Sequence, residues 1–61
     1  MILKTNLNVK TKYKTVVPRG ARGIVMTWVV EDYTHIVIVK VEFVNGECLW
    51  FLERDLEEVI E

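Results

Sequence analysis

Few residues of this 61-residue chain have side chains suited to catalysis or metal binding. The single histidine, His35, has no second ligand or base near it in the sequence, so we expect it on the surface, with no part in proton transfer. The single cysteine, Cys48, has no internal disulfide partner and no neighbouring base to activate its thiol. We expect Cys48 to pack as a small apolar residue.

Two groups of charged residues remain as candidate ion sites. Arg19 and Arg22 lie on a glycine-containing segment that could hold phosphate, although the segment lacks the spacing of a P-loop. Carboxylates also gather near the C-terminus, where a solvated acidic end is more common than a chelated cation. These are Glu53, Asp55, Glu57 and Glu58. The sequence therefore predicts a chain that is not an enzyme and that uses no metal and no cofactor.

The net charge of −1 hides a strong asymmetry along the chain. Residues 1–22 contain basic residues and no acidic ones, whereas all the acidic residues lie within residues 23–61. One interpretation is that the two halves form neighbouring strands and neutralise each other. The other is a basic face for nucleic acid or an acidic partner. Its residues would be Lys10, Lys12, Lys14, Arg19 and Arg22.

The spacing of apolar residues predicts short strands and no long helix. Expected strands cover residues 7–17, 24–31, 35–44, 47–52 and 57–61, with one helical turn over residues 53–56. In the first strand, the side chains expected on the buried face are Leu7, Val9, Thr11 and Tyr13. Pro18 and the glycines after it predict a turn over residues 18–23, and Asn45-Gly46 predicts a hairpin. Strands this short can bury one face by closing into a small barrel.

Three stretches of the sequence resemble the small SH3-like β-barrels. They are residues 20–25 (GARGIV), residues 37–43 (VIVKVEF), and Phe51, Leu56 and Val59 in the spacing F-x4-L-x2-V. Within that superfamily the pattern is similar to the SH3-like subunit of photosystem I and to the variable chain of ferredoxin-thioredoxin reductase, and more loosely to KOW-type modules. The resemblance covers residues 9–60. It implies an all-β, five-stranded SH3-like barrel with one short helical turn before the last strand, acting as a non-catalytic accessory or docking domain.

The predicted hairpin at residues 45–46 allows two registers, and a slip of one residue exchanges the two faces of the strand. A two-residue loop pairs Val41 with Trp50 and places Trp50 in the core. A three-residue loop pairs Val41 with Leu49 and turns Trp50 outward. Buried area does not separate the two registers. The resemblance selects the three-residue loop, because it implies that Phe51 lies in the core.

The two tryptophans are the leading candidates for a partner-binding surface. With the three-residue loop, Trp50 lies opposite Lys40, within reach of a cation–π contact. For Trp28 two alternatives remain: the apolar alternation of its strand favours the core, whereas the resemblance favours Val25 as the inward residue and turns Trp28 outward. The predicted partner-binding residues are Trp28, Trp50, Lys40, Arg19, Arg22 and Tyr33.

The expected protein is a single domain over residues 1–61, located in the cytoplasm. No apolar run approaches the roughly 20 residues that cross a bilayer, so we expect no membrane span. The expected function is a docking module, a small accessory or regulatory protein that contacts a protein partner. The alternative is a nucleic-acid-binding module of KOW type that uses the basic segment, with Trp28 or Tyr33 for stacking. An exposed tryptophan patch is equally consistent with a homo-oligomer.

Overall fold

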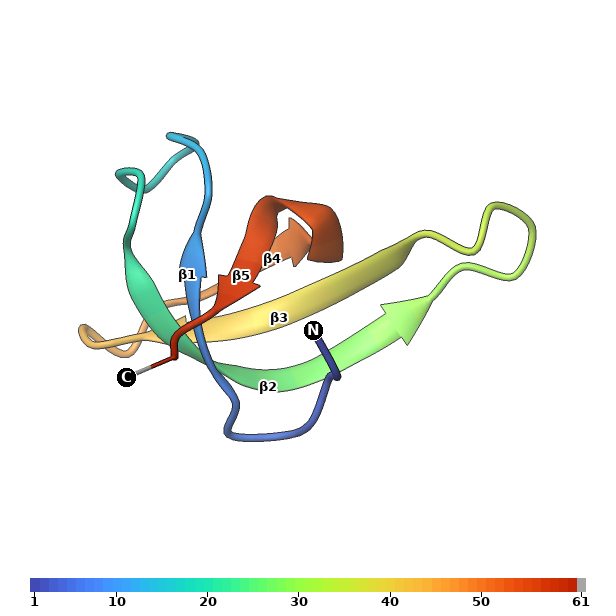
Figure 1. Ribbon diagram of the computed structural model, residues 1–61, viewed down its shortest axis with the longest axis horizontal. Helices are drawn as coiled ribbons and strands as arrows, with labels where there is room; N and C mark the ends of the chain where they lie inside the picture. Colours follow the sequence, from blue (N-terminus) through green and yellow to red (C-terminus); the bar gives the residue numbers. More distant parts are fainter. Residues whose placement is uncertain (61) are drawn as a thin grey trace.

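The computed structural model describes residues 1–60 and shows a single five-stranded antiparallel sheet (Figure 1). The strands are β1 Asn8–Thr11, β2 Arg22–Val30, β3 Val37–Phe43, β4 Cys48–Leu52 and β5 Leu56–Glu58. One 3-10 turn, η1, covers Glu53–Asp55 between the last two strands. The strand order is β4-β3-β2-β1-β5. The all-β class and the short helical turn before the last strand are confirmed.

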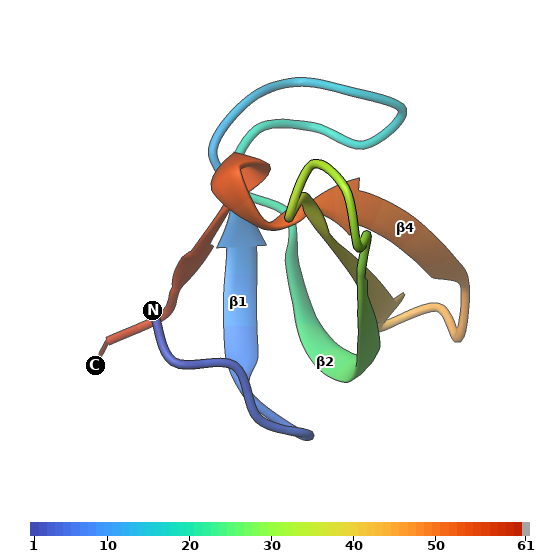
Figure 2. The ribbon, with the colours of Figure 1, turned by 90° about the vertical axis from the view of Figure 1, so that its right-hand side faces the viewer.

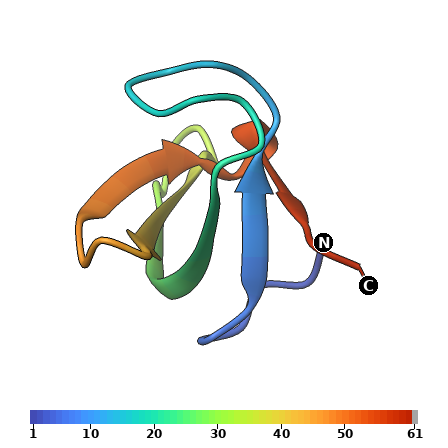
Figure 3. The same cartoon turned by 90° about the vertical axis from the view of Figure 1, so that its left-hand side faces the viewer.

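The sheet curls strongly around its inner face (Figures 2 and 3). β1 and β5 form one side, β3 and β4 form the other, and β2 bends between them. Among residues 1–60 no ladder joins β4 to β5, so the sheet keeps two edges and is not a closed barrel. Curling buries the inner face, but the edges that a closed barrel would remove are still present.

The core lies on this inner face and draws on every strand. Its buried apolar residues are Leu7, Val9, Val25, Val39, Val41, Phe51 and Leu56. The ring of Phe43 packs edge-on against Phe51, with the ring centroids 5.8 Å apart. Thr11 is a buried polar residue whose hydroxyl donates a 2.9 Å hydrogen bond to the carbonyl of Pro18, so its burial leaves no unpaired group. The predicted inward positions Val9, Thr11, Phe51 and Leu56 are confirmed.

A bulge in β2 decides where Trp28 lies. Val25 pairs with Val41 and Trp28 pairs with Val39, so β2 has one more residue than β3 over this stretch, and Met26 is the extra one. Side chains alternate along a regular strand, but the bulge places Val25 and Trp28 on the same, inner face. Trp28 is partly buried and packs against the core. The outward placement of Trp28 is therefore wrong, whereas the inward placement of Val25 is confirmed.

Gly23 lies where β3 leaves no room for a side chain on β2. A Cβ atom at Gly23 would lie 2.4 Å from Cγ1 of Val41 and 2.8 Å from the carbonyl oxygen of Glu42. Real Cβ atoms essentially never approach other heavy atoms this closely, so the missing side chain is a packing requirement.

The β3–β4 connection is the three-residue loop selected by the resemblance. The N–H of Gly46 donates to the carbonyl of Phe43, and the N–H of Phe43 donates to the carbonyl of Glu47, both at 2.9 Å. Gly46 has a φ of 84°, which glycine adopts without strain. The ladder beyond the loop pairs Val41 with Leu49, so the predicted register is confirmed.

The first strand is shorter than predicted. β1 ends at Thr11 instead of extending to residue 17, and Tyr13 is 59% exposed on the following loop instead of buried. The N–H of Thr11 donates to the carbonyl of Ala21 and the N–H of Lys12 donates to the carbonyl of Asp55, and these two bonds continue the β1–β2 and β1–β5 ladders to the end of the strand. β2 begins two residues earlier than expected, at Arg22.

The other strand limits also differ from the prediction. β3 begins at Val37 because His35 has a φ of 57°, a left-handed conformation that a strand cannot contain. Leu56, expected in the helical turn, is the first residue of β5. β5 ends at Glu58, so the expected last strand is wrong for residues 59 and 60, and residue 61 lies outside the described residues.

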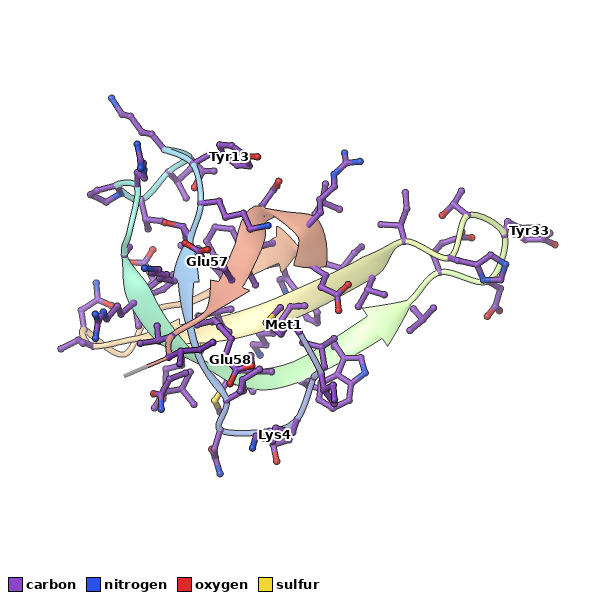
Figure 4. The ribbon with its side chains drawn as sticks, viewed as in Figure 1. Met1, Lys4, Tyr13, Tyr33, Glu57 and Glu58 are labelled. Carbon is purple, nitrogen blue, oxygen red and sulfur yellow. The ribbon has the colours of Figure 1, made fainter. Side chains whose placement is uncertain are left out.

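β2 and β3 extend beyond the rest of the sheet as a two-stranded arm (Figure 1). At its end, the carboxylate of Glu31 accepts hydrogen bonds from the backbone N–H and, at 2.6 Å, from the hydroxyl of Thr34. These bonds lower the pKa of Glu31 from its ordinary value, the side-chain bond contributing most. Tyr33 stands at the tip, pointing away from the sheet, and is 92% exposed (Figure 4).

Candidate functional site

The outer face of the sheet carries the candidate site. The ladders bring Val29, Ile38 and Leu52 into one row across β2, β3 and β4. In the next row, Lys40 lies directly opposite Trp50. We call these residues the Trp50 face: Val29, Ile38, Lys40, Trp50 and Leu52. Trp50 is 50% and Val29 54% exposed, and the other three are half-buried, so the face is a contiguous apolar patch with one cation.

The arrangement of this face follows from the register of the hairpin. Val39 and Phe51 are paired and buried on the inner face. Side chains alternate along a strand, so the residues directly before and after each of them point to the outer face. The predicted juxtaposition of Trp50 with Lys40 is therefore confirmed. Val29, Ile38 and Leu52 were not among the predicted site residues. The sequence signal for this row is Ile38, an apolar residue on the otherwise polar face of β3.

Toward the β3–β4 loop, the next row of the outer face has an acidic residue at its centre. Glu42 pairs with Cys48 on one side and with Ile24 on the other. Cys48 is free and exposed, so the expectation that it packs as an apolar residue is wrong. The reason is its position on the outward-facing side at the start of β4, where its sulfur lies 4.0 Å from the carbonyl oxygen of Gly46.

The other predicted partner-binding residues do not join the Trp50 face. Trp28 lies on the opposite side of the sheet, packed against the core. Tyr33 is at the tip of the arm, Arg19 is exposed on the β1–β2 loop, and Arg22 is the first residue of β2. Arg19 and Tyr33 were selected by residue type, which does not determine where a loop residue lies.

A shallow hollow of about 590 Å³ lies where the start of β2 meets the end of β3. Its walls are formed by Asn8, Arg22, Gly23, Ile24, Glu42, Phe43, Val44 and Val59. A cation and an anion, Arg22 and Glu42, therefore line the same hollow. This mixture of charges does not favour the predicted phosphate site at Arg19 and Arg22, because a carboxylate repels phosphate.

The basic segment divides between two environments. On β1, Lys10 lies opposite Glu57 of β5, and the two side chains form an ion pair at 3.7 Å. At this point the basic and acidic halves neutralise each other as the first interpretation of the charge asymmetry predicts. Lys12, Lys14 and Arg19 lie instead on the β1–β2 loop, where all three are exposed.

The chemistry-bearing residues do not converge. Among residues 1–60 there is no group of three or more His, Cys, Asp or Glu side chains placed to hold a metal ion. His35 precedes β3 and Cys48 pairs with its far end, which separates them by roughly 20 Å of extended chain. None of the helical structure in residues 1–60 has the length and apolarity that a membrane crossing requires.

No protein-family model matches the chain, and neither the curated proteins nor the solved structures contain a significant match to it. The function must therefore be inferred from the surface of the molecule itself.

Proposed function

We propose that this chain is a non-catalytic docking module, a small accessory or regulatory protein that contacts a protein partner through the Trp50 face. The observation that carries the proposal is the half-exposed ring of Trp50 within a contiguous apolar patch on paired strands. Isolated exposed apolar residues are common on protein surfaces, whereas contiguous patches indicate binding. Tryptophan on a rigid surface is the residue type most enriched at binding hot spots.

The composition of the face indicates what it would bind. Lys40 is the only charged member, and it lies opposite Trp50. The core of a protein interface is depleted in charge, so a buried cation there requires an opposite charge on the partner. The proposed partner surface is apolar, with one carboxylate directed at Lys40.

We also propose that the fold is of the SH3-like type. In its support, the chain has five short antiparallel strands with η1 before the last one. Phe51 and Leu56 of the F-x4-L-x2-V spacing are buried in the core, and Val59 is half-buried. An SH3-like fold is consistent with a binding module, because the small curled sheet leaves its outer surface for contacts.

Affinity capture from the native lysate, with the tagged chain as bait, tests the docking proposal. Trp50→Ala should reduce the amount of a specifically bound protein by about tenfold or more, as expected for a hot-spot residue. Tyr33→Ala is the matched control, because it removes an exposed aromatic ring outside the Trp50 face. The double substitution of Arg19 and Arg22 by alanine should also leave capture unchanged. Equal capture by Trp50→Ala and the wild type would refute the proposal.

The β1–β2 loop supports a second candidate, nucleic-acid binding of the KOW type. Lys12, Lys14 and Arg19 are exposed on this loop together with Tyr13, an aromatic ring available for stacking (Figure 4). Fluorescence anisotropy with generic single-stranded DNA and RNA tests it. Binding should weaken steeply between about 50 and 200 mM salt, because each phosphate contact releases counterions. Absence of binding at the lower salt concentration rejects this candidate.

A further inference from the structure

We propose that two copies of this chain pair along the outer edges of their β4 strands and form one continuous antiparallel sheet. The starting observation is that β4 ends the strand order, so that β3 lies along one of its edges and no strand lies along the other (Figures 2 and 3). The inference does not depend on the docking function, because it uses the backbone edge of β4 instead of the side chains of the Trp50 face.

The hairpin determines which backbone groups face this edge. The N–H of Phe43 bonds to the carbonyl of Glu47, which fixes the phase of the β3–β4 ladder. Hydrogen-bonded and non-bonded pairs alternate in an antiparallel ladder, so Leu49 and Phe51 direct their N–H and C=O groups at β3. The intervening residues direct theirs at the open edge. These are Cys48, Trp50 and Leu52.

β4 lacks the features that usually protect an edge strand from pairing. Its five residues, CLWFL, are all apolar, without a charge or a proline, and its ladder with β3 runs without a bulge. The opposite edge, β5, is only three residues long and contains Glu57 and Glu58. β5 is therefore blunted by charge, and β4 is the edge that remains available for pairing.

A second copy is the occupant that matches this edge. Two-fold pairing centred on Trp50 places Cys48 opposite the partner's Leu52 and Leu49 opposite the partner's Phe51. Every residue of the uncharged strand then faces an apolar residue, and every outward N–H meets a carbonyl. The next register with the same hydrogen-bond pattern is shifted by two residues and would bring Cys48 opposite the partner's Arg54. In the register centred on Trp50, the uncharged strand therefore faces only uncharged residues of the partner's β4.

The flanks and the size of the contact set its strength. In this register Glu47 faces the partner's Glu53, and the like charges weaken association. Two five-residue strands bury less than the roughly 1,200 Å² that stable interfaces bury. We therefore expect a weak dimer, with a Kd on the order of 10–100 µM.

Concentration-dependent measurements on the full chain test the pairing. Sedimentation equilibrium between about 5 µM and 1 mM should show the apparent mass rising from 7.2 kDa toward twice that value. Over the same range, amide hydrogen exchange followed by NMR should slow for Cys48, Trp50 and Leu52 and stay constant for Leu49 and Phe51. A constant mass up to 1 mM would refute the proposal and leave the edge to an extended segment of another protein. A rising mass without slower exchange at the three edge amides would also refute it, and would indicate stacking through the Trp50 face.

A charge reversal at the flank tests the register. E47K replaces a like-charge contact with the partner's Glu53 by an attractive one on both sides of the dimer, and should tighten association by about fivefold. E42K is the matched control, because it makes the same charge change on β3, away from the edge. Equal effects of the two substitutions would show that net charge governs association, and would contradict this register. Neither substitution alters the Trp50 face, so the outcome is separate from that of the docking proposal.

A disulfide provides an independent test of the same register. In L52C, the introduced thiol would face the partner's Cys48 across a pair with Cα atoms about 5.5 Å apart, within disulfide range. Oxidised glutathione would accept the two electrons and the two protons, and a covalent dimer should form. V29C is the matched control, because Val29 lies in the same row but two strands from the edge. Equal yields of covalent dimer from the two variants, or none from L52C, would overturn the proposed register.

Discussion

Gly23→Ala introduces a methyl group where β3 leaves no room for a side chain on β2. The added Cβ would lie 2.4 Å from Cγ1 of Val41 and 2.8 Å from the carbonyl oxygen of Glu42, where ordinary contacts begin at 3.4 Å. The overlaps are therefore about 1.0 Å and about 0.6 Å. One of the two neighbours, or the pairing of the two strands, has to move.

Neither neighbour can move freely. Val41 is 1% exposed, and its β-branched side chain has few alternative rotamers. The carbonyl of Glu42 belongs to the β2–β3 pairing itself. Overpacking of this kind costs about 3 kcal/mol. A domain of this size has a total stability of roughly 3–9 kcal/mol. We therefore expect the Tm to fall by roughly 12–24 °C.

Thermal unfolding followed by far-UV circular dichroism, and urea unfolding followed by tryptophan fluorescence, measure this effect. Val41→Ala removes the methyl group that the new Cβ would strike, so the double variant should be less destabilised than the sum of the single variants by at least ~1 kcal/mol. A Gly23→Ala variant within ~0.5 kcal/mol of the wild type, or strictly additive effects in the double variant, would refute the reasoning.

Three further effects follow from individual residues. His35→Gly should raise the free energy of unfolding, measured by urea titration, by about 0.5–1 kcal/mol, because a φ of 57° strains histidine and not glycine. The bonds from Thr34 lower the folded-state pKa of Glu31, so the stability they give is complete above the ordinary carboxyl pKa and is lost as the pH falls through the lowered one. Glu31→Gln should therefore reduce the loss of urea resistance as the pH is lowered below the ordinary carboxyl pKa, and an unchanged pH profile would contradict this. Lys10→Ala should change stability by less than ~0.5 kcal/mol, and by less still in 1 M salt, because the 3.7 Å pair with Glu57 is partly exposed to solvent.

The parts of the fold that the sequence predicts correctly are governed by local patterns. Alternating valines identify the inward face of β3, since a strand that buries one side must alternate. Gly46 supplies the left-handed conformation of the three-residue loop. The choice between the two hairpin registers, however, needed the resemblance, because both registers bury similar areas.

The orientation of Trp28 could not be read from its own strand. It depends on the extra residue at Met26, and that bulge is set by how β2 pairs with β3. The end of β1 is similarly non-local, because the strand pairs with β5, which is distant in sequence, only as far as Thr11. Such contacts leave no signal in the alternation of the segment itself.

The candidate site was predicted in part for the same reason. The register of one hairpin was enough to place Trp50 opposite Lys40. Val29 joins them only through a second ladder and across the bulge, and its membership therefore emerged from the structure. Arg19 and Tyr33 were selected by residue type alone, and both lie away from the Trp50 face on loops.

Fluorine NMR tests most directly whether Trp50 marks the working surface. The chain contains two tryptophans, so labelling with 5-fluorotryptophan gives two resonances, which the Trp50→Phe variant assigns. Adding the protein captured by the wild-type chain should shift or broaden the Trp50 resonance and leave that of Trp28 unchanged. A change confined to Trp28, or no change in either resonance, would contradict the assignment of the Trp50 face as the binding surface.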